Sequence, residues 1–291
     1  MGDVLSGLHA SWEFGADSVL IRYERGIRTP RLLHALGERR IPFAALGGVE
    51  LAEGKRGTVV LRLVPRPGAD PLHDVAAGQL REGCDPYRLV LPESRATLAE
   101  YYRDELRTAL GGDVGDPDGL DDGSPCAPMV AVPPVPLHFK AYDAKASFDG
   151  RAVVFRWFWT GASSAKWKAG DQTFPVAALG GVEWRSPEGL SGHLRLVPAG
   201  SAPARGPADQ DPAAVVFGLG YGSVHESLPF AAAVLAAIRA AGPARLPAPP
   251  PARRDPSEVA DRIRHLGALH RDGILTDAEF AAKKAELLAE L

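Results

Sequence analysis

The stretch Ala44-Ala45-Leu46-Gly47-Gly48-Val49-Glu50 occurs a second time as Ala177-Ala178-Leu179-Gly180-Gly181-Val182-Glu183. A second string, Leu61-Arg62-Leu63-Val64-Pro65, returns as Leu194-Arg195-Leu196-Val197-Pro198. Both strings return at the same distance, since the differences 177 − 44 and 194 − 61 are equal. Two strings with one common offset indicate a duplicated domain, and the rest of the chain is organised around that duplication.

The composition is that of a globular protein with nearly balanced charge. The chain has 291 residues, of which 45% are hydrophobic and 24% charged, and its formal net charge is -3. That length accommodates two domains of ordinary size and a small third piece. The charge balance argues against a nucleic-acid partner, because dedicated nucleic-acid binders carry a basic excess.

The start of the chain and its cysteines both favour a reducing compartment. The start lacks a charged-then-apolar signal pattern, and no apolar run approaches the ~18 residues that a membrane helix needs. Cys84 and Cys126 form no metal-binding pair, and we interpret them as free thiols. We therefore expect a cytoplasmic protein, with peripheral attachment to the inner face of the membrane as the alternative.

The first repeat has the pattern of antiparallel strands followed by one helix. Residues 18–23 and 87–91 are apolar and bounded by turn residues, and residues 58–64 alternate before Pro65 ends the strand. Apolar residues then recur at helical spacing at Leu98, Tyr101, Tyr102, Leu106 and Leu110. Residues 152–157 of the second repeat match the first strand if one residue is inserted. The pattern predicts a mainly β, α+β fold in which the helix packs on a curved sheet.

Linkers rich in proline and glycine set the predicted boundaries. The parts are repeat one (1–110), an acidic and proline-rich linker (111–136), repeat two (137–241), a proline-rich linker (242–256) and a helical hairpin (257–291). The apolar stripe of the hairpin consists of Ile263, Leu266, Leu269, Ile274, Phe280, Leu287 and Leu288. A piece shorter than ~40 residues usually needs outside help to fold, so we expect this stripe to be buried on a second copy or on another surface.

The hairpin resembles the SHOCT family, a short helical domain at the ends of many bacterial proteins. The resemblance is carried by Ile263, Leu266, Leu269, Asp272-Gly273-Ile274-Leu275-Thr276, Glu279-Phe280, Lys283-Lys284 and Leu287-Leu288. It implies oligomerisation or contact with a partner protein, and it implies no catalytic role.

The two repeats resemble the domain of unknown function numbered 4429, which often occurs as two copies ahead of a SHOCT hairpin. The two AALGGVE strings and the two LRLVP strings carry this resemblance. It implies a fold similar to that of pleckstrin-homology (PH) domains, in which a bent antiparallel sheet or barrel is capped by a C-terminal helix. Because one fold hosts many functions, the resemblance describes architecture better than activity.

The glycine pairs Gly47-Gly48 and Gly180-Gly181 interrupt patterns that otherwise predict strands. Paired glycines inside a strand indicate a β-bulge or a close approach of two backbones. We interpret both pairs as structural elements that let the sheet bend. On this interpretation, Gly48→Val destabilises repeat one.

A basic cluster is the strongest candidate for a ligand site. Its members are Arg22, Arg25, Arg28, Arg31, Arg39 and Arg40 in repeat one, and Lys166 and Lys168 in repeat two. Arginine forks bind phosphate and carboxylate groups bidentately, and PH-like folds often bind anions near this first loop. The alternative is that these side chains are ordinary solvated cations balanced by Glu24 and Glu38. The cluster therefore predicts either a weak anion or lipid-headgroup site or an ordinary charged surface.

No arrangement of residues indicates catalysis. Gly218-Leu219-Gly220-Tyr221-Gly222-Ser223 follows a strand and precedes a helix, as a dinucleotide-binding loop does, but no second strand completes a βαβ unit. The histidines are scattered, and His265 and His270 are five residues apart, which places them on different helix faces. We therefore predict no catalytic residue, no cofactor and no metal.

These observations predict a non-enzymatic binding and assembly protein. The hairpin is expected to contact a second copy or another protein, while the two repeats present surfaces to a ligand or partner. The alternative is peripheral association with an anionic membrane through the basic loops. Trp157, Trp159 and Trp167 are the unusual aromatics of repeat two, and we interpret them as core residues, with an exposed tryptophan as the alternative anchor for a partner.

Overall fold

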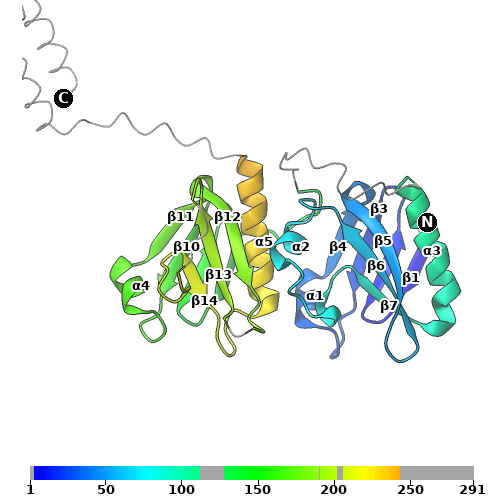
Figure 1. Cartoon of the computed structure of the whole chain (residues 1–291), viewed down its shortest axis with the longest axis horizontal. Helices are drawn as coiled ribbons and strands as arrows, with labels where there is room; N and C mark the ends of the chain where they lie inside the picture. The colour runs from blue at the N-terminus through cyan, green and yellow to red at the C-terminus, as the bar shows by residue number, and fades with distance from the viewer. Residues whose placement is uncertain (1–2, 112–127, 190, 202–205, 243–291) are drawn as a thin grey trace, which may run out of the picture. The chain divides into compact units, whose positions relative to one another are not determined.

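A computed structural model describes residues 3–111, 128–189, 191–201 and 206–242, which form two copies of one domain (Figure 1). Each copy contains a four-stranded and a three-stranded antiparallel sheet, followed by a helix. The fold is therefore α+β and mainly β, as the sequence predicts. The described residues of both repeats belong to one compact unit.

The secondary structure elements of the two repeats follow the same order. Repeat one contains β1 (Asp3–Ser6), β2 (Ala10–Phe14), β3 (Ser18–Tyr23), α1 (Arg31–Leu36), β4 (Glu38–Pro42), β5 (Leu46–Glu53), β6 (Thr58–Pro65), α2 (Pro71–Ala76), β7 (Arg88–Pro92) and α3 (Ala96–Ala109). Repeat two contains β8 (Leu137–Lys140), β9 (Ala144–Phe148), β10 (Ala152–Trp157), α4 (Ser164–Ala169), β11 (Gln172–Pro175), β12 (Leu179–Arg185), β13 (His193–Pro198), β14 (Ala214–Val216) and α5 (Val224–Ala241). Short 3-10 turns lie at Phe43–Ala45, Glu82–Cys84, Glu93–Arg95 and Val176–Ala178.

All four sheets are meanders, in which each strand pairs with the next one along the chain. Their strand orders are β1-β2-β3-β4 and β5-β6-β7 in repeat one, and β8-β9-β10-β11 and β12-β13-β14 in repeat two. Among the described residues neither repeat closes into a barrel. The segment 18–23 is the third strand and not the first, because two short and partly polar strands pair ahead of it.

The repeats correspond closely in register. Strands β1, β2 and β3 begin at positions 3, 10 and 18, and β8, β9 and β10 begin at positions 137, 144 and 152, so one offset relates all three pairs. Strands β5 and β12 begin at positions 46 and 179, an offset smaller by one, which confirms the single insertion predicted from the sequence. Helix α4 takes the place of α1, whereas no helix of repeat two takes the place of α2 among the described residues.

The glycine pairs lie at β-bulges, as predicted. The pairing of β5 with β6 shifts register between Leu46 and Gly48, and that of β12 with β13 shifts between Leu179 and Gly181. A Cβ added at Gly48 would meet no atom within 4 Å, so the expected destabilisation by Gly48→Val has no steric basis. The tighter position is Gly180, where an added Cβ would lie 3.2 Å from the Cα of Ala199.

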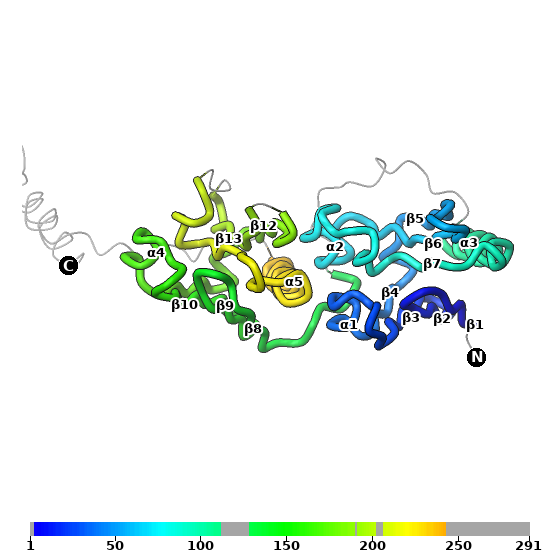
Figure 2. The backbone as a smooth tube through the Cα atoms, turned by 90° about the horizontal axis from the view of Figure 1, so that it is seen from below, coloured from blue at the N-terminus to red at the C-terminus, as the bar shows by residue number. Residues whose placement is uncertain are grey.

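The helices that end the two repeats differ in what covers them. Helix α3 buries Ala99, Tyr102 and Leu106 on its own sheets and leaves its other side exposed. Helix α5 is buried on nearly all sides, because β8 and β12 cover one side while α1 and α2 of repeat one cover another (Figure 2). Residues Leu32, Leu72 and Val75 of repeat one thus join the core of repeat two.

One described helix is long and apolar enough to cross a membrane. Helix α5 meets both criteria over its 18 residues, contrary to the expectation that no apolar run reaches this length. In the structure its apolar residues are buried against both repeats, which accounts for an apolar composition on every side of a helix.

Candidate functional site

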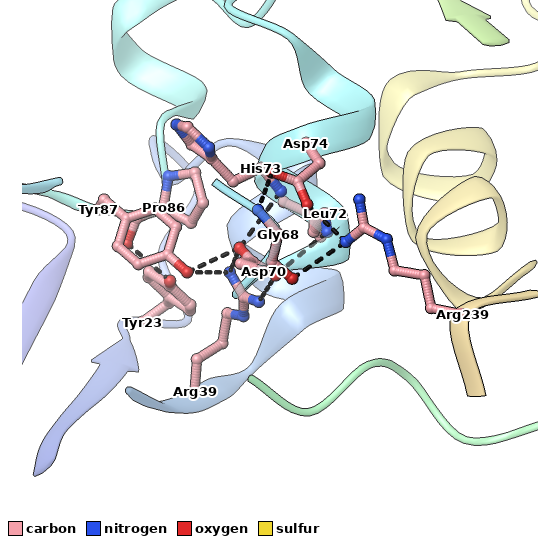
Figure 3. Close-up of polar contacts among 10 residues, drawn as sticks. All are labelled: Tyr23, Arg39, Gly68, Asp70, Leu72, His73, Asp74, Pro86, Tyr87 and Arg239. Carbon is pink, nitrogen blue, oxygen red and sulfur yellow. Dashed lines mark hydrogen bonds and ion pairs between the residues drawn. The ribbon is translucent and has the colours of Figure 1, made fainter. Parts of the chain in front are cut away.

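The structure divides the predicted basic cluster into buried and exposed residues, and Arg39 is buried. Arg39 lies in β4 with its side chain 5% exposed, and it donates to both carboxylate oxygens of Asp70, at 2.7 and 3.1 Å (Figure 3). Tyr87 donates its hydroxyl to the same carboxylate at 2.6 Å. Contrary to its place in the predicted cluster, Arg39 is therefore not available to an external anion.

The carboxylate of Asp70 also begins α2. It accepts the backbone N–H groups of Leu72 at 3.1 Å and His73 at 3.2 Å, which is the N-cap arrangement. Pro71 follows at the first helical position, where its fixed φ favours the start of a helix. One buried side chain thus satisfies the start of α2 and ties the helix to β4.

The electrostatics of this network follow from burial and from Arg39. Burial alone would raise the pKa of Asp70, but the Arg39 charge and the hydrogen bonds from Arg39, Tyr87 and Leu72 outweigh it, and the pKa lies below its usual value. Burial raises the pKa of Tyr87 well above that of a free tyrosine. The site therefore holds one carboxylate and one guanidinium in their charged forms and a neutral phenol.

Repeat two has its own buried ion pair at a different place. Lys166 in α4 is fully buried, and its Nζ lies 2.5 Å from Oδ2 of Asp143 in the β8–β9 turn. The other oxygen, Oδ1, accepts the N–H of Val216 at 2.9 Å. Burial lowers the pKa of Lys166, and the hydrogen bond and charge of Asp143 oppose this shift. Lys166 therefore cannot contribute to the predicted anion site either, because its ammonium group is buried and paired with Asp143.

The opposite side of α2 contacts repeat two. Asp74 of α2 accepts from Nη1 of Arg239 in α5 at 2.6 Å, and the same nitrogen donates to the carbonyl of Gly68 at 3.1 Å (Figure 3). Beyond α2, Gln79 donates to the carbonyl of Trp184 at 3.0 Å and accepts the N–H of Ser186 at 3.1 Å. These contacts hold one end of repeat one against α5 and β12, so α2 is a structural link between the repeats.

A second arrangement occurs in both repeats and was missed in the sequence. In repeat one, Arg62 of β6 lies 3.1 Å from Asp85 and 3.8 Å from Glu50. In repeat two, the corresponding residues are brought together in the same way, with distances of 2.9 and 3.3 Å for Arg195 with Asp211 and Glu183. The signal was present, because each aspartate is followed by proline and each arginine lies in an LRLVP string.

The aspartates of this arrangement also shape the backbone. Oδ1 of Asp85 accepts the N–H of Tyr87 at 3.0 Å, and Oδ1 of Asp211 accepts the N–H of Ala213 at 2.9 Å. Such Asx turns fix the entry of the chain into β7 and β14. Repetition in both domains and this local bonding identify the arrangement as part of the fold.

A cleft of about 400 Å³ lies between the outer face of β5 and β6 and the chain that follows α2. Its lining includes Glu50, Glu53, Arg62, His73, Glu82, Asp85 and Arg88. Both of its arginines are paired with carboxylates of the cleft, Arg62 with Glu50 and Asp85, and Arg88 with Glu82. The cleft therefore offers no unpaired cation to an anionic ligand.

The remaining members of the predicted cluster are exposed. Arg22 pairs with Glu13 and with Glu38, and Arg40 donates to the hydroxyl of Ser18. Arg25 and Arg28 are exposed in the loop before α1, Arg31 is exposed at the start of α1, and Lys168 is exposed in α4. The structure does not bring the eight residues together into one site, because two are enclosed and the others belong to two repeats.

Exposed aromatic residues gather at one end of repeat two, which we call the aromatic end. Its aromatic members are Tyr142 in the β8–β9 turn, Trp159 after β10, Trp167 in α4 and Tyr221 before α5, and the exposed aliphatic Leu219 lies beside Tyr221 in the sequence. Trp159 is 80% and Trp167 51% exposed, and their rings pack edge to face with centroids 5.7 Å apart. The rings of Tyr142 and Tyr221 pack in the same way at 6.3 Å. Two of the three tryptophans interpreted as core residues are therefore surface residues.

Trp157 is the tryptophan that does belong to the core. Its side chain is buried, and its indole N–H donates to the carbonyl of Gly170 at 2.7 Å. The period-two alternation of β10 points Phe155 and Trp157 inward, whereas Trp159 lies beyond the end of the strand. The strand boundary, which the sequence pattern leaves uncertain by a few residues, thus decides which tryptophan is exposed.

The glycine-rich segment before α5 forms a tight turn. Gly220 and Gly222 have φ values of 80° and 65°, a region that favours glycine. A Cβ on Gly222 would lie 2.1 Å from the ring of Phe217, and one on Gly218 would lie 3.1 Å from Tyr142. Chain geometry and packing therefore account for these glycines without a bound nucleotide.

The predicted hairpin residues, Ile263, Leu266, Leu269, Ile274, Phe280, Leu287 and Leu288, lie outside the described residues, as does Cys126. Cys84 is described and is a free thiol.

Comparison with known proteins identifies the parts of the chain. A family model described as a domain of unknown function (DUF4429) matches residues 12–107 and again residues 146–235, which together are more than half of the chain. A model described as a short C-terminal domain (SHOCT) matches residues 261–288. A search of curated proteins found no match.

Proposed function

The chain belongs to the DUF4429 family, and from this premise we propose that it is a non-enzymatic binding protein whose ligand surface is the aromatic end of repeat two. The observation that carries the proposal is the exposed pair Trp159 and Trp167, whose two large apolar rings lie together in solvent. Exposed clusters of this kind are typical of interaction sites, and tryptophan is enriched among residues that dominate binding energy.

The position of the pair within the domain supports the same conclusion. In repeat one, α1 at the corresponding end packs against α5 of repeat two, while the loop before α1 stays exposed. Helix α4, which takes the place of α1, has no such cover among the described residues and presents Trp167 to solvent. This end of the domain therefore serves as a contact surface once within the chain, and we infer that the second copy of the surface serves an external partner.

The exchange Trp159→Ala with Trp167→Ala tests the ligand surface. The immobilised native protein is used to retain a partner from an extract of the producing cells. We expect the double variant to bind that partner about 30-fold or more weakly, which is the effect of removing a dominant interface residue. Quantitative retention at several bait concentrations measures the loss.

Tyr101→Ala is the matched control, because Tyr101 is an exposed aromatic on α3, away from the aromatic end. Its retention should equal that of the native protein. Equal retention by the tryptophan variant, with an unchanged melting temperature, would rule out the aromatic end as the ligand surface.

We further propose that the C-terminal hairpin mediates self-association, which the SHOCT match at residues 261–288 supports. Light scattering of the full chain and of a version ending at Ala241 measures this directly. We expect the full chain to be a multimer and the shortened version to be a monomer. The same number of chains per particle in both versions would contradict the proposal.

The proposed setting is the cytoplasm, with no cofactor and no catalytic step. The sequence-based alternative, membrane association through the basic loops, retains Arg25, Arg28 and Arg31 around the exposed Ile27 in repeat one. Arg39 and Lys166 cannot take part in membrane association, because their charged groups are buried and paired. The vesicle experiment described below includes variants of this loop, so it tests the alternative together with the further inference.

A further inference from the structure

One rung of the four-stranded sheet of repeat two, across β8, β9 and β10, is a row of three cations. Lys140 of β8 is the direct register partner of Lys145 of β9, and Lys145 is the direct partner of Arg156 of β10. All three are exposed and lie on the outer face, because they alternate with the buried residues Phe139 and Phe155. Neighbouring strands are about 4.8 Å apart, so like charges face each other directly across two strand pairs.

No acidic side chain neutralises this cationic row within the described part of the chain. None of its three members forms an ion pair there. The nearest acids along the chain are engaged elsewhere, since Asp143 pairs with Lys166 and accepts the N–H of Val216, and Asp149 accepts the N–H groups of Arg151 and Ala152. Like charges placed directly opposite destabilise a sheet, so the fold does not account for the row.

Repeat one shows that the fold does not require these cations. The corresponding positions, at the offset that relates β1 to β8, are Ser6, Ser11 and Arg22, which pair across the sheet in the same register. There the single cation is balanced, because Arg22 forms ion pairs with Glu13 and Glu38. The same sheet position is thus neutralised in one repeat and carries three unbalanced positive charges in the other.

The cationic row adjoins the aromatic end. Tyr142 follows Lys140 in the β8–β9 turn, and Trp159 follows Arg156 after β10. These two segments are joined, because the N–H of Phe158 donates to the carbonyl of Asp143 at 2.8 Å. Cationic side chains beside exposed tryptophan and tyrosine form the combination that suits the interface of an anionic bilayer, where the rings enter the headgroup layer and the cations meet lipid phosphates.

Resting on the aromatic end as the ligand surface, we propose that its partner is an anionic phospholipid bilayer, which repeat two contacts through Lys140, Lys145 and Arg156 with Trp159 and Tyr142. The formal net charge of -3 for the whole chain argues against a nucleic acid, whereas a local row of three cations is enough for a lipid surface. Attraction confined to one small face also orients the protein on the surface.

The test is co-sedimentation of the full chain with vesicles of phosphatidylglycerol mixed with phosphatidylcholine, and with vesicles of phosphatidylcholine alone. We expect binding only to the anionic vesicles, weakened by added salt. The double variant Lys140→Ser with Lys145→Ser introduces the serines that repeat one has at these positions. Because it removes two like charges that face each other, it should not impair folding. We expect it to bind about 25-fold more weakly, the product of roughly fivefold for each lysine.

Two further variants and one competitor make each outcome decisive. Arg25→Ser with Arg28→Ser removes the same charge from the repeat one loop and should leave most binding intact. Trp159→Ala should remove most of the blue shift of tryptophan emission on anionic vesicles. Inorganic phosphate, added while the total ionic strength is held constant, should not compete with vesicle binding. Competition would identify a free-anion site and overturn the proposal.

Equal binding to both vesicle types, or a larger loss in the repeat one variant than in the lysine variant, would also overturn the bilayer assignment. These results are distinguishable from failure of the proposed function. If the tryptophan variant loses a protein partner while the native chain ignores anionic vesicles, the ligand surface stands and its assignment to a bilayer falls.

Discussion

Asp70→Ala is expected to lower the free energy of unfolding by about 3–5 kcal/mol, the range found when one partner of a buried ion pair is removed. The guanidinium of Arg39 would remain in the interior with its side chain 5% exposed and no carboxylate to accept its two hydrogen bonds. The variant also removes the N-cap of α2, and α2 carries the contacts to α5. Urea unfolding followed by tryptophan fluorescence measures the loss.

The double variant Arg39→Met with Asp70→Asn separates the charge effect from the loss of the cap. Asparagine keeps an N-cap oxygen for α2, and methionine removes the unpaired charge while filling similar space. We expect the double variant to recover most of the stability lost by Asp70→Ala. If the double variant is as unstable as the single one, an unpaired buried charge is not what destabilises Asp70→Ala.

The pH dependence of the Asp70 contribution has a definite sign. Because the folded-state pKa of Asp70 lies below its usual value, the carboxylate stabilises the fold above the unfolded pKa of about 3.9. That stability is lost as pH falls through the folded pKa. The difference in unfolding free energy between the native chain and Asp70→Asn should therefore be full at neutral pH and shrink in acid below about pH 4.

Asp143→Ala is expected to destabilise repeat two by a similar amount, about 3–5 kcal/mol at neutral pH. It leaves the fully buried ammonium of Lys166 without its partner at 2.5 Å, and it leaves the N–H of Val216 without its acceptor. Burial already lowers the pKa of Lys166, and removal of Asp143 takes away the charge that opposes this shift. In this variant Lys166 can release its proton and become neutral, which reduces the loss in the free energy of unfolding.

Deprotonation of Lys166 makes the effect of Asp143→Ala depend on pH. A lysine with a lowered folded-state pKa binds fewer protons when folded, so stability rises with pH from that pKa up to the unfolded value of about 10.4. The gap between Asp143→Ala and the native chain should narrow as pH is raised from neutral. Asp143→Ala combined with Lys166→Met is the control, because without the amine it should be more stable and show no such rise. A gap that is independent of pH would contradict a buried, charged Lys166.

Local patterns in the sequence predicted much of the fold, because strands, bulges and turns depend on near neighbours. The repeated strings indicated the duplication, and the alternation of residues 58–64 indicated β6 before its partners were known. The glycine pairs indicated bulges, and the register shifts at Gly48 and Gly181 confirm them. Short polar strands such as β1 escaped notice because they have too few apolar residues to show a period.

The candidate site was predicted less well, because charge and exposure depend on residues that are distant in the sequence. Arg39 is neutralised by Asp70, 31 residues away, and Lys166 by Asp143, 23 residues away. A basic side chain resembles a ligand site until the chain folds and a distant part of the sequence supplies its counter-ion. The reverse holds for Lys140 and Lys145, which drew no attention until the register placed them opposite each other.

The sequence by itself determined the duplication and, in each repeat, a series of strands followed by one helix, because repeated strings and residue periodicity can be read without knowing how the chain folds. Only the tertiary structure decided which cations are buried, which tryptophans face solvent, and that α2 joins the two repeats by packing on α5. These properties depend on distances through space. Burial removes water from a charge and forces it to find a partner, and that partner is set by the fold and not by the neighbouring sequence.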